Sequence, residues 1–309
     1  MEEMQYYRHK IEDAINKKIE DLRLVSNTNN IVLKYVVQGK NYYAKFYQNG
    51  KTHTDNELLL YENMPEEGKK YLKTLIYSNK DDNFAIYDEV KGKMLDEMLD
   101  NKEITKELAN KIAKSLIDYF NIIAKIKSKN YGSLSGNFEG KYQDFETFLH
   151  EYLKSTSETL SNSIYTKQLA ELPEIMLKKH RDILNEGYSV VAPIDSNFKN
   201  IMITDKDEVK VIDPGAIVSA PKAMGLGELV SHSFGTIIYE ELIRELNPTI
   251  EEKKRLSIYA TFSLMNIMAF LIRNNIGDIR AAKPFGNTHT FFELIKMHEN
   301  CIEKNTYLV

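Results

Sequence analysis

The sequence predicts an α+β protein of two lobes, in which a small antiparallel sheet with one main helix precedes a larger, mostly helical part. Two observations support this prediction. Short apolar segments separated by turn residues fill residues 19–47 and 74–90, which is typical of antiparallel strands. From residue 105 onwards, apolar residues recur at helical spacing over long segments. We therefore expect an N-terminal lobe of residues 1–90 and a C-terminal lobe of residues 91–309.

Composition narrows the class of protein. The chain has 309 residues, 42% of them hydrophobic and 28% charged, as in ordinary globular proteins. Its net charge of −4 and its scattered basic residues argue against a nucleic-acid partner. A single cysteine, Cys301, cannot form an internal disulfide, and the first residues lack an apolar signal segment, so we expect a cytoplasmic protein. The apolar run at residues 260–272 is too short to span a bilayer, so we expect no membrane partner.

The N-terminal lobe is expected to begin with an amphipathic helix at residues 2–18. Three strands follow as a meander, at residues 19–25, 31–37 and 42–47, with a polar turn and Gly39 between them. Asp55 is suited to cap the next helix, which Pro65 ends. Residues 74–78 and 83–90 complete the expected sheet.

Lys45 lies in an aromatic run of the third strand. A lysine on an exposed edge strand is a simple explanation for it. The helix that follows favours a second one, because Glu57 falls in its expected first turn, twelve residues after Lys45. At this spacing a helix glutamate can hold a strand lysine over the phosphates of a nucleotide. Glu62 fits this position less well.

The C-terminal lobe is expected to be built from helices. Their apolar spacing and the positions of Pro248 and Pro284 place them at residues 94–99, 105–127, 145–153, 174–185, 226–246, 249–275 and 290–304. The polar residues 155–165 are expected to lie outside helices, as is the Gly/Ser/Asn-rich segment 131–140.

Residues 190–215 contain the most informative pattern. Asp195 precedes Asn200 by five residues, and two short apolar strands, at residues 201–203 and 209–212, lead to Asp213. Such a hairpin brings the two carboxylates and the amide to one end, where they can perform magnesium-assisted phosphoryl transfer: one carboxylate accepts a hydroxyl proton, and the other two groups hold Mg²⁺. Taken alone, the pattern fits a surface hairpin with polar ends equally well.

With these motifs in order, the sequence resembles the aminoglycoside phosphotransferase and choline kinase type of small-molecule kinase, which has a protein-kinase-like fold. The resemblance implies that Lys45 and Glu57 bind nucleotide, that Asp195 is the catalytic base, and that Asn200 and Asp213 hold Mg²⁺. It also implies that the backbone of Asp88 and Val90, in the connector between the lobes, binds the base, and that the hydroxyl of Ser26 or Thr28 binds phosphate.

Two departures from that family stand out. Pro193-Ile194-Asp195 replaces the usual His-Gly-Asp, so another feature must position Asp195. The turn at residues 26–30 has no glycine, unlike the phosphate loop of protein kinases. These departures favour the main alternative, a catalytically silent nucleotide-binding scaffold. An enzyme is favoured because the lysine, the glutamate, the base and both metal ligands are all retained, and a scaffold would not need the base and both ligands. The segment after Gly215 is too short to dock a peptide, which makes a protein kinase the weaker third possibility.

The resemblance leaves the acceptor open. An aminoglycoside or another amino-sugar antibiotic is one candidate, which would make the protein an antibiotic-resistance factor. A sugar, a nucleoside, a choline-like alcohol and a methylthioribose-like metabolite are others. We expect ATP or GTP as phosphate donor, a small hydroxyl-bearing substrate, and a monomer or weak homodimer. Glu228, Glu240 and Glu241 fit either an acidic cleft for a cationic acceptor or solvated helix faces.

Overall fold

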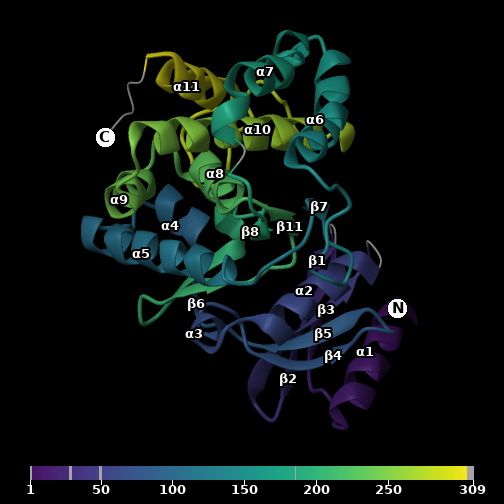
Figure 1. Ribbon diagram of the computed structural model, residues 1–309. Helices are drawn as coiled ribbons and strands as arrows, with labels where there is room; N and C mark the ends of the chain where they lie inside the picture. The colour runs from purple at the N-terminus through teal and green to yellow at the C-terminus, as the bar shows by residue number, and fades with distance from the viewer. Residues whose placement is uncertain (1, 28–29, 49–50, 185, 305–309) are drawn as a thin grey trace.

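The computed structural model describes residues 2–27, 30–48, 51–184 and 186–304. A sheet-rich part formed by the first third of the chain packs below a larger helical part (Figure 1). Its five-stranded antiparallel sheet has the order β1-β2-β3-β5-β4. The strands are β1 (Leu22–Asn27), β2 (Asn30–Val37), β3 (Lys40–Tyr47), β4 (Leu75–Asn79) and β5 (Phe84–Asp88). The expected α+β class and antiparallel sheet are confirmed.

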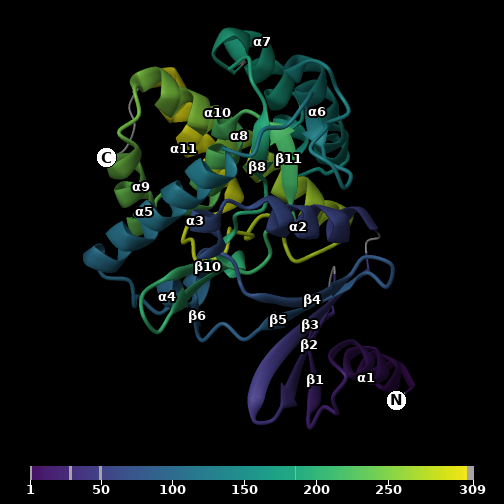
Figure 2. The same cartoon turned by 60° about the horizontal axis from the view of Figure 1, so that its bottom comes forward.

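The two faces of this sheet are covered by different helices. Every second residue of β2 is buried, and these side chains pack with Ile11 of α1 (Glu2–Ile15). On the other side, α2 (Lys51–Asn63) and the short α3 (Glu66–Lys69) lie between the sheet and the helical part (Figure 2). The sheet therefore has one face closed by its own helix and one face directed toward the rest of the molecule.

The start of α2 differs from the expectation. The helix begins at Lys51, so Asp55 lies inside it and Glu57 is in its second turn rather than its first. None of the four residues before Asp55 is glycine or proline, so the chain contains no signal that would delay the helix until Asp55. The prediction that Asp55 caps this helix is therefore wrong.

Helices α4 to α11 form the larger part. They are α4 (Leu95–Asp100), α5 (Lys106–Ile123), α6 (Phe145–Ser161), α7 (Leu172–Leu184), α8 (Lys222–Ser233), α9 (Ile237–Leu246), α10 (Ile250–Arg273) and α11 (Phe291–Lys304). Short 3-10 turns lie at η1 (Lys167–Leu169) and η2 (Phe198–Asn200). The large core of this part is formed by α5, α8, α9, α10 and α11.

Two expected helix boundaries are wrong. The polar stretch after residue 155 continues α6 to Ser161, because Thr156 and Leu160 turn inward while its other polar residues face solvent. The single helix expected at residues 226–246 is two helices, α8 and α9. Between them, Gly235 has φ +79°, a backbone conformation that glycine adopts without strain.

Two small sheets hold the loops of the larger part. One has the order β10-β9-β6, and the other β7-β11-β8. Their strands are β6 (Gly92–Met94), β7 (Gly132–Ser133), β8 (Val190–Pro193), β9 (Ile201–Thr204), β10 (Val209–Val211) and β11 (Ile217–Ala220). Strands β9 and β10 form the expected hairpin, with Ile201 opposite Val211.

Helix α10 is the central apolar helix. In the described part of the chain it is the one helix long and apolar enough to cross a membrane, by length and composition. However, 67% of its apolar stretch is buried inside the protein, where it packs against α6, α8 and α11. This is the environment of a core helix.

Candidate active site

Lys45 is placed by the register of the sheet. It stands opposite Val32 on β2 and Ala85 on β5, and Ser26 of β1 stands opposite Val32 in turn. Residues directly opposite one another in an antiparallel sheet share a face. One row of side chains on the face that points toward the larger part of the protein is therefore formed by Ser26, Val32, Lys45 and Ala85.

The Lys45 ammonium joins the two halves of the chain. Its Nζ donates to Glu57 Oε2 at 2.6 Å and to Asp213 Oδ1 at 2.7 Å, and the residue is only 5% exposed. Burial alone would lower its pKa, but the two carboxylates outweigh that effect and raise the pKa of Lys45 to about 12. The lysine is therefore a fixed positive charge rather than a residue of an exposed edge strand.

Glu57 is completely buried in α2. Burial opposes its ionisation, but Lys45 and Lys73 outweigh this and lower the pKa of Glu57 to about 2. The Tyr87 hydroxyl donates to its second oxygen at 2.6 Å. Gly215 lies so close to α2 that a Cβ at this position would be 2.9 Å from the Glu57 Cβ, so the glycine permits this contact.

Lys73 is a functional candidate that the sequence did not reveal. Its Nζ lies 3.6 Å from Glu57 Oε1 and 3.6 Å from the centre of the Tyr87 ring. Burial outweighs the attraction of Glu57 and lowers the pKa of Lys73 to about 8. The lysine precedes β4 in a segment without periodic pattern, so only the tertiary structure brings it to Glu57. We name Lys45, Glu57, Lys73 and Asp213 the paired cluster.

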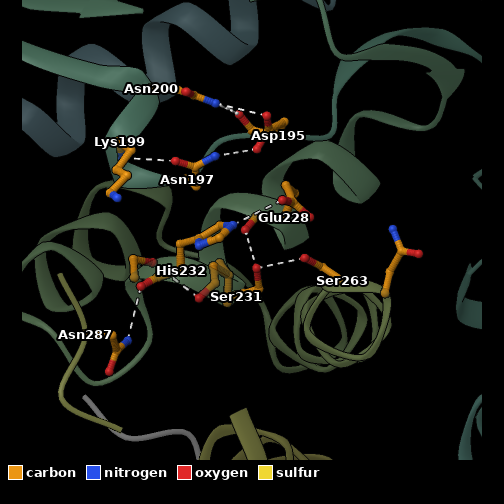
Figure 3. A network of polar contacts seen from close by, with 12 residues as sticks. Asp195, Asn197, Lys199, Asn200, Glu228, Ser231, His232, Ser263 and Asn287 are labelled. Carbon is orange, nitrogen blue, oxygen red and sulfur yellow. Dashed lines mark hydrogen bonds and ion pairs between the residues drawn. The ribbon is translucent and has the colours of Figure 1, made fainter. Parts of the chain in front are cut away.

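Asp195 lies in the loop between β8 and η2. Asn197 Nδ2 donates to its Oδ1, and Asn200 Nδ2 donates to its Oδ2 at 3.0 Å (Figure 3). The side chain reaches solvent, yet protein surrounds its carboxylate on most sides. Burial and then the nearby Glu228 carboxylate raise the pKa of Asp195 to about 6.

Strand pairing positions Asp195 in the absence of the usual histidine. Pro193 ends β8 opposite Ile217 of β11, and the Ile194 N–H donates to the Ala216 carbonyl at 2.9 Å. On the other side of Asp195, the Phe198 ring is completely buried and anchors the loop in the core. The loop is therefore held by backbone pairing at one end and by the Phe198 ring at the other. The side chain of residue 193 is not needed for either contact.

Asn200 and Asp213 are linked through the hairpin, since the Ile212 N–H donates to the Asn200 carbonyl at 2.9 Å. Within the described ranges, no group of three or more His, Cys, Asp or Glu side chains could hold a metal ion by itself. One amide and one carboxylate fit Mg²⁺ better, because this ion keeps several waters and completes its coordination with phosphate oxygens. Asn200 Nδ2 and Asp213 Oδ1 are already hydrogen-bonded, so Asn200 Oδ1 and Asp213 Oδ2 are the oxygens that could hold such an ion.

The other predicted nucleotide-binding residues are placed as follows. Ser26 belongs to β1 and pairs with Val32, so it is a strand residue rather than part of a turn. Thr28 lies outside the described residues. The Asp88 N–H donates to the Thr74 carbonyl at 3.0 Å, so only its backbone carbonyl is left to contact a base. The Val90 N–H has no hydrogen-bond partner in the part of the chain that the structure describes.

The sequence left Glu228 between an acidic cleft and a solvated helix face, and it did not single out His232. Both lie on α8, where every residue from Ala223 to Ser233 is buried, and His232 Nε2 is 3.2 Å from Glu228 Oε1. Figure 3 shows Glu228 below Asp195, whereas Asn200 lies to the left of Asp195. We name Asp195, Glu228 and His232 the acidic cluster.

A separate cavity of 240 Å³ lies between α6 and α7. Its lining combines apolar side chains with polar ones that include His150, Glu174 and Arg181. None of the site residues described above lines this cavity. The chemistry-bearing side chains therefore converge elsewhere, between the sheet and the β9–β10 hairpin.

No family model matches the sequence, and no curated protein matches it by sequence. Solved structures match the fold. Aminoglycoside phosphotransferase APH(4)-Ia superposes with a TM-score of 0.69 at 10% identity, over 97% of this chain and 96% of that one. Choline kinase LicA from Streptococcus pneumoniae superposes with a TM-score of 0.67 at 11% identity, over 98% of this chain and 100% of that one.

A thermostable APH(4)-Ia mutant in ternary complex with ADP and hygromycin B is a further match, with a TM-score of 0.68 at 11% identity over 96% of each chain. At such low identity the superposition establishes the fold alone. The fold that the resemblance implied is confirmed: the chain has the protein-kinase-like fold of small-molecule kinases such as these two.

Proposed function

We propose that the protein is a kinase that transfers the γ-phosphoryl group of ATP or GTP to a hydroxyl of a small molecule. One observation carries the proposal. The Lys45 ammonium binds Glu57 and Asp213 together, and the hairpin that ends at Asp213 also holds Asn200 against Asp195. A phosphate-binding cation, two metal-ligating groups and a base thus form one connected set, as phosphoryl transfer requires.

Each residue has a distinct role in this proposal. Lys45, oriented by Glu57, binds phosphate oxygens of the nucleotide. Asn200 and Asp213 would hold Mg²⁺, which neutralises charge on the phosphates when it is bound. Asp195 orients the acceptor hydroxyl and accepts its proton, while Asn197 and Asn200 fix the direction of the carboxylate.

Mass detection of phosphorylated product tests the proposal. The protein is incubated with Mg·ATP or Mg·GTP and a panel of amino-sugar antibiotics, sugars, nucleosides and amino alcohols. Asp195→Asn should lower turnover by about 10² to 10⁴ while nucleotide affinity stays unchanged, because the base does not contact the nucleotide's phosphates. Asp205→Asn, in the exposed turn of the same hairpin, is the matched control and should keep full activity.

Two results would contradict the assignment. Full activity of Asp195→Asn would show that Asp195 is not the base. Nucleotide binding without product from any acceptor would support the alternative of a catalytically silent scaffold.

A further inference from the structure

The Glu57 carboxylate is shared between two lysines. Its Oε2 accepts from Lys45, whereas its Oε1 accepts from the Tyr87 hydroxyl and lies 3.6 Å from Lys73 Nζ. The Lys73 ammonium also stands 3.6 Å from the centre of the Tyr87 ring, which is close enough for a cation–π contact. One oxygen of the carboxylate thus faces each lysine.

The backbone at Lys73 is tied to two neighbouring elements. The Tyr61 hydroxyl of α2 donates to the Lys73 carbonyl at 3.0 Å. Two residues earlier, the Tyr71 carbonyl accepts from the Val211 N–H, in the hairpin that leads to Asp213. Only 12% of the Lys73 side chain is exposed. A lysine buried to this degree is costly unless its charge is compensated, so its ammonium is held beside Glu57.

The charges of the paired cluster balance only because Lys73 is present. Without it, Lys45 would face Glu57 and Asp213, and one positive with two negative charges leaves a net charge of −1. The phosphates of a nucleotide are anionic, so a negative site would repel them. With Lys73 the cluster is neutral, and the attraction of the Lys45 ammonium for phosphate is preserved.

We propose that Lys73 is a positioning residue of the nucleotide site, which offsets the charge of Glu57 and fixes its carboxylate so that Lys45 can bind phosphate. The inference rests on the proposed kinase function and adds a residue to its nucleotide site. Lys73 acts through Glu57, because its ammonium lies at Oε1 whereas Lys45 occupies Oε2.

Calorimetric titration of Mg·ADP at pH 7 tests the inference without turnover. We expect Lys73→Met to bind Mg·ADP about tenfold more weakly than the wild type, because the cluster becomes negative. Lys73→Arg keeps the positive charge and should recover most of the affinity. Thermal unfolding of each variant verifies that it is folded.

Lys80→Met is the matched control. Lys80 pairs with Glu62 of the same helix at 2.9 Å, but both side chains are exposed. An exposed ion pair contributes little, so this variant should keep the affinity of the wild type. The comparison separates the buried charge beside Glu57 from a general loss of positive charge around α2.

The groups that face Lys73 allow its charge to be removed by pH as well. Burial and then Lys45 lower the pKa of Lys73 to about 8, although Glu57 and Asp213 raise it. The pKa of Lys45 is raised to about 12 and that of Glu57 is lowered to about 2, so both stay charged above pH 7. Burial raises the pKa of both neighbouring tyrosines well above 10, so they stay neutral up to pH 9.5: Tyr61 and Tyr87.

Titrations of Mg·ADP between pH 7 and 9.5 use this difference. As the pH rises through about 8, the wild type loses the Lys73 charge, and its affinity should fall toward that of Lys73→Met. The fall should be absent in Lys73→Arg, whose guanidinium stays charged, and in Lys73→Met, which has no charge to lose. A lysine that served only for packing would not produce this difference.

The outcomes separate this role from the kinase function. Wild-type affinity in Lys73→Met, equal losses in Lys73→Met and Lys73→Arg, or the same pH dependence in all three proteins would overturn the inference. If phosphorylated product still forms in these cases, the kinase function stands. Weaker binding in Lys73→Met that Lys73→Arg restores, without product from any acceptor, would support the inference and contradict the kinase function alone.

Discussion

The paired cluster and the acidic cluster differ in charge balance. In the paired cluster, two lysines meet two carboxylates, and Tyr87 satisfies the second oxygen of Glu57. In the acidic cluster, the two carboxylates of Asp195 and Glu228 are accompanied by a single histidine, His232, which contacts Glu228. The difference indicates that positive and negative charges balance within the paired cluster but not within the acidic cluster.

Glu57→Gln would break the paired cluster most severely. The substitution leaves Lys45 and Lys73 buried with too little negative charge, so the free energy of unfolding should fall by about 3 to 5 kcal/mol. Denaturant titration measures the loss. Glu62→Gln changes an exposed glutamate of the same helix and should cost far less. Equal losses in the two variants would show that Glu57 is not held by its lysines.

The pH dependence of stability sharpens the comparison through Lys73. Its pKa of about 8 in the folded protein lies below the unfolded value of 10.5. Between about pH 8 and 10 the unfolded chain therefore binds more protons, and this residue makes the protein more stable as the pH rises. The gain should be about 2 kcal/mol and should be absent in Lys73→Met.

Chemical denaturation at pH 8, 9 and 10 measures this effect. The window ends near pH 10 because Tyr87 then begins to ionise in the unfolded chain. Burial raises the pKa of Tyr87 in the folded protein above its ordinary value, so this ionisation lowers the free energy of unfolding. An identical pH profile for wild type and Lys73→Met would mean that the ammonium is not buried near Glu57.

Glu228→Gln should have the smallest effect on stability, and of the opposite sign to Glu57→Gln. Removing an underpaired carboxylate relieves its burial and its repulsion of Asp195, so the free energy of unfolding should rise by about 1 kcal/mol. The same denaturant titration measures it. A loss of several kcal/mol would show that the Glu228 carboxylate is a structural ion-pair partner of His232.

Residues with a local pattern were predicted well from the sequence. The hairpin at Asn200 and Asp213 follows from apolar alternation around a polar turn, and the contact between Lys45 and Glu57 follows from a strand and a helix that adjoin in the chain. The α+β class follows from the same periodicities. Gly235 separates α8 from α9 and is a local break signal that the sequence itself contains.

Contacts between distant segments could not be predicted in this way. Lys73 reaches Glu57 only because the segment before β4 pairs with β10, where the Val211 N–H donates to the Tyr71 carbonyl at 2.7 Å. Glu228 resembles a residue of a solvated helix face until the packing of α8 is known. The strand pairing that replaces the histidine is likewise tertiary, since β8 and β11 lie on either side of the hairpin in the chain.

The central claim is that Lys45, Asn200 and Asp213 converge on a metal-bound nucleotide. Calorimetric titration of ATP with Mg²⁺ and with EDTA, for the wild type and Asp213→Ala, tests it most directly. We expect Mg²⁺ to strengthen ATP binding to the wild type and to have little effect on Asp213→Ala, because the carboxylate that would hold the ion is gone. ATP affinity that is the same with Mg²⁺ and with EDTA in the wild type would contradict the account.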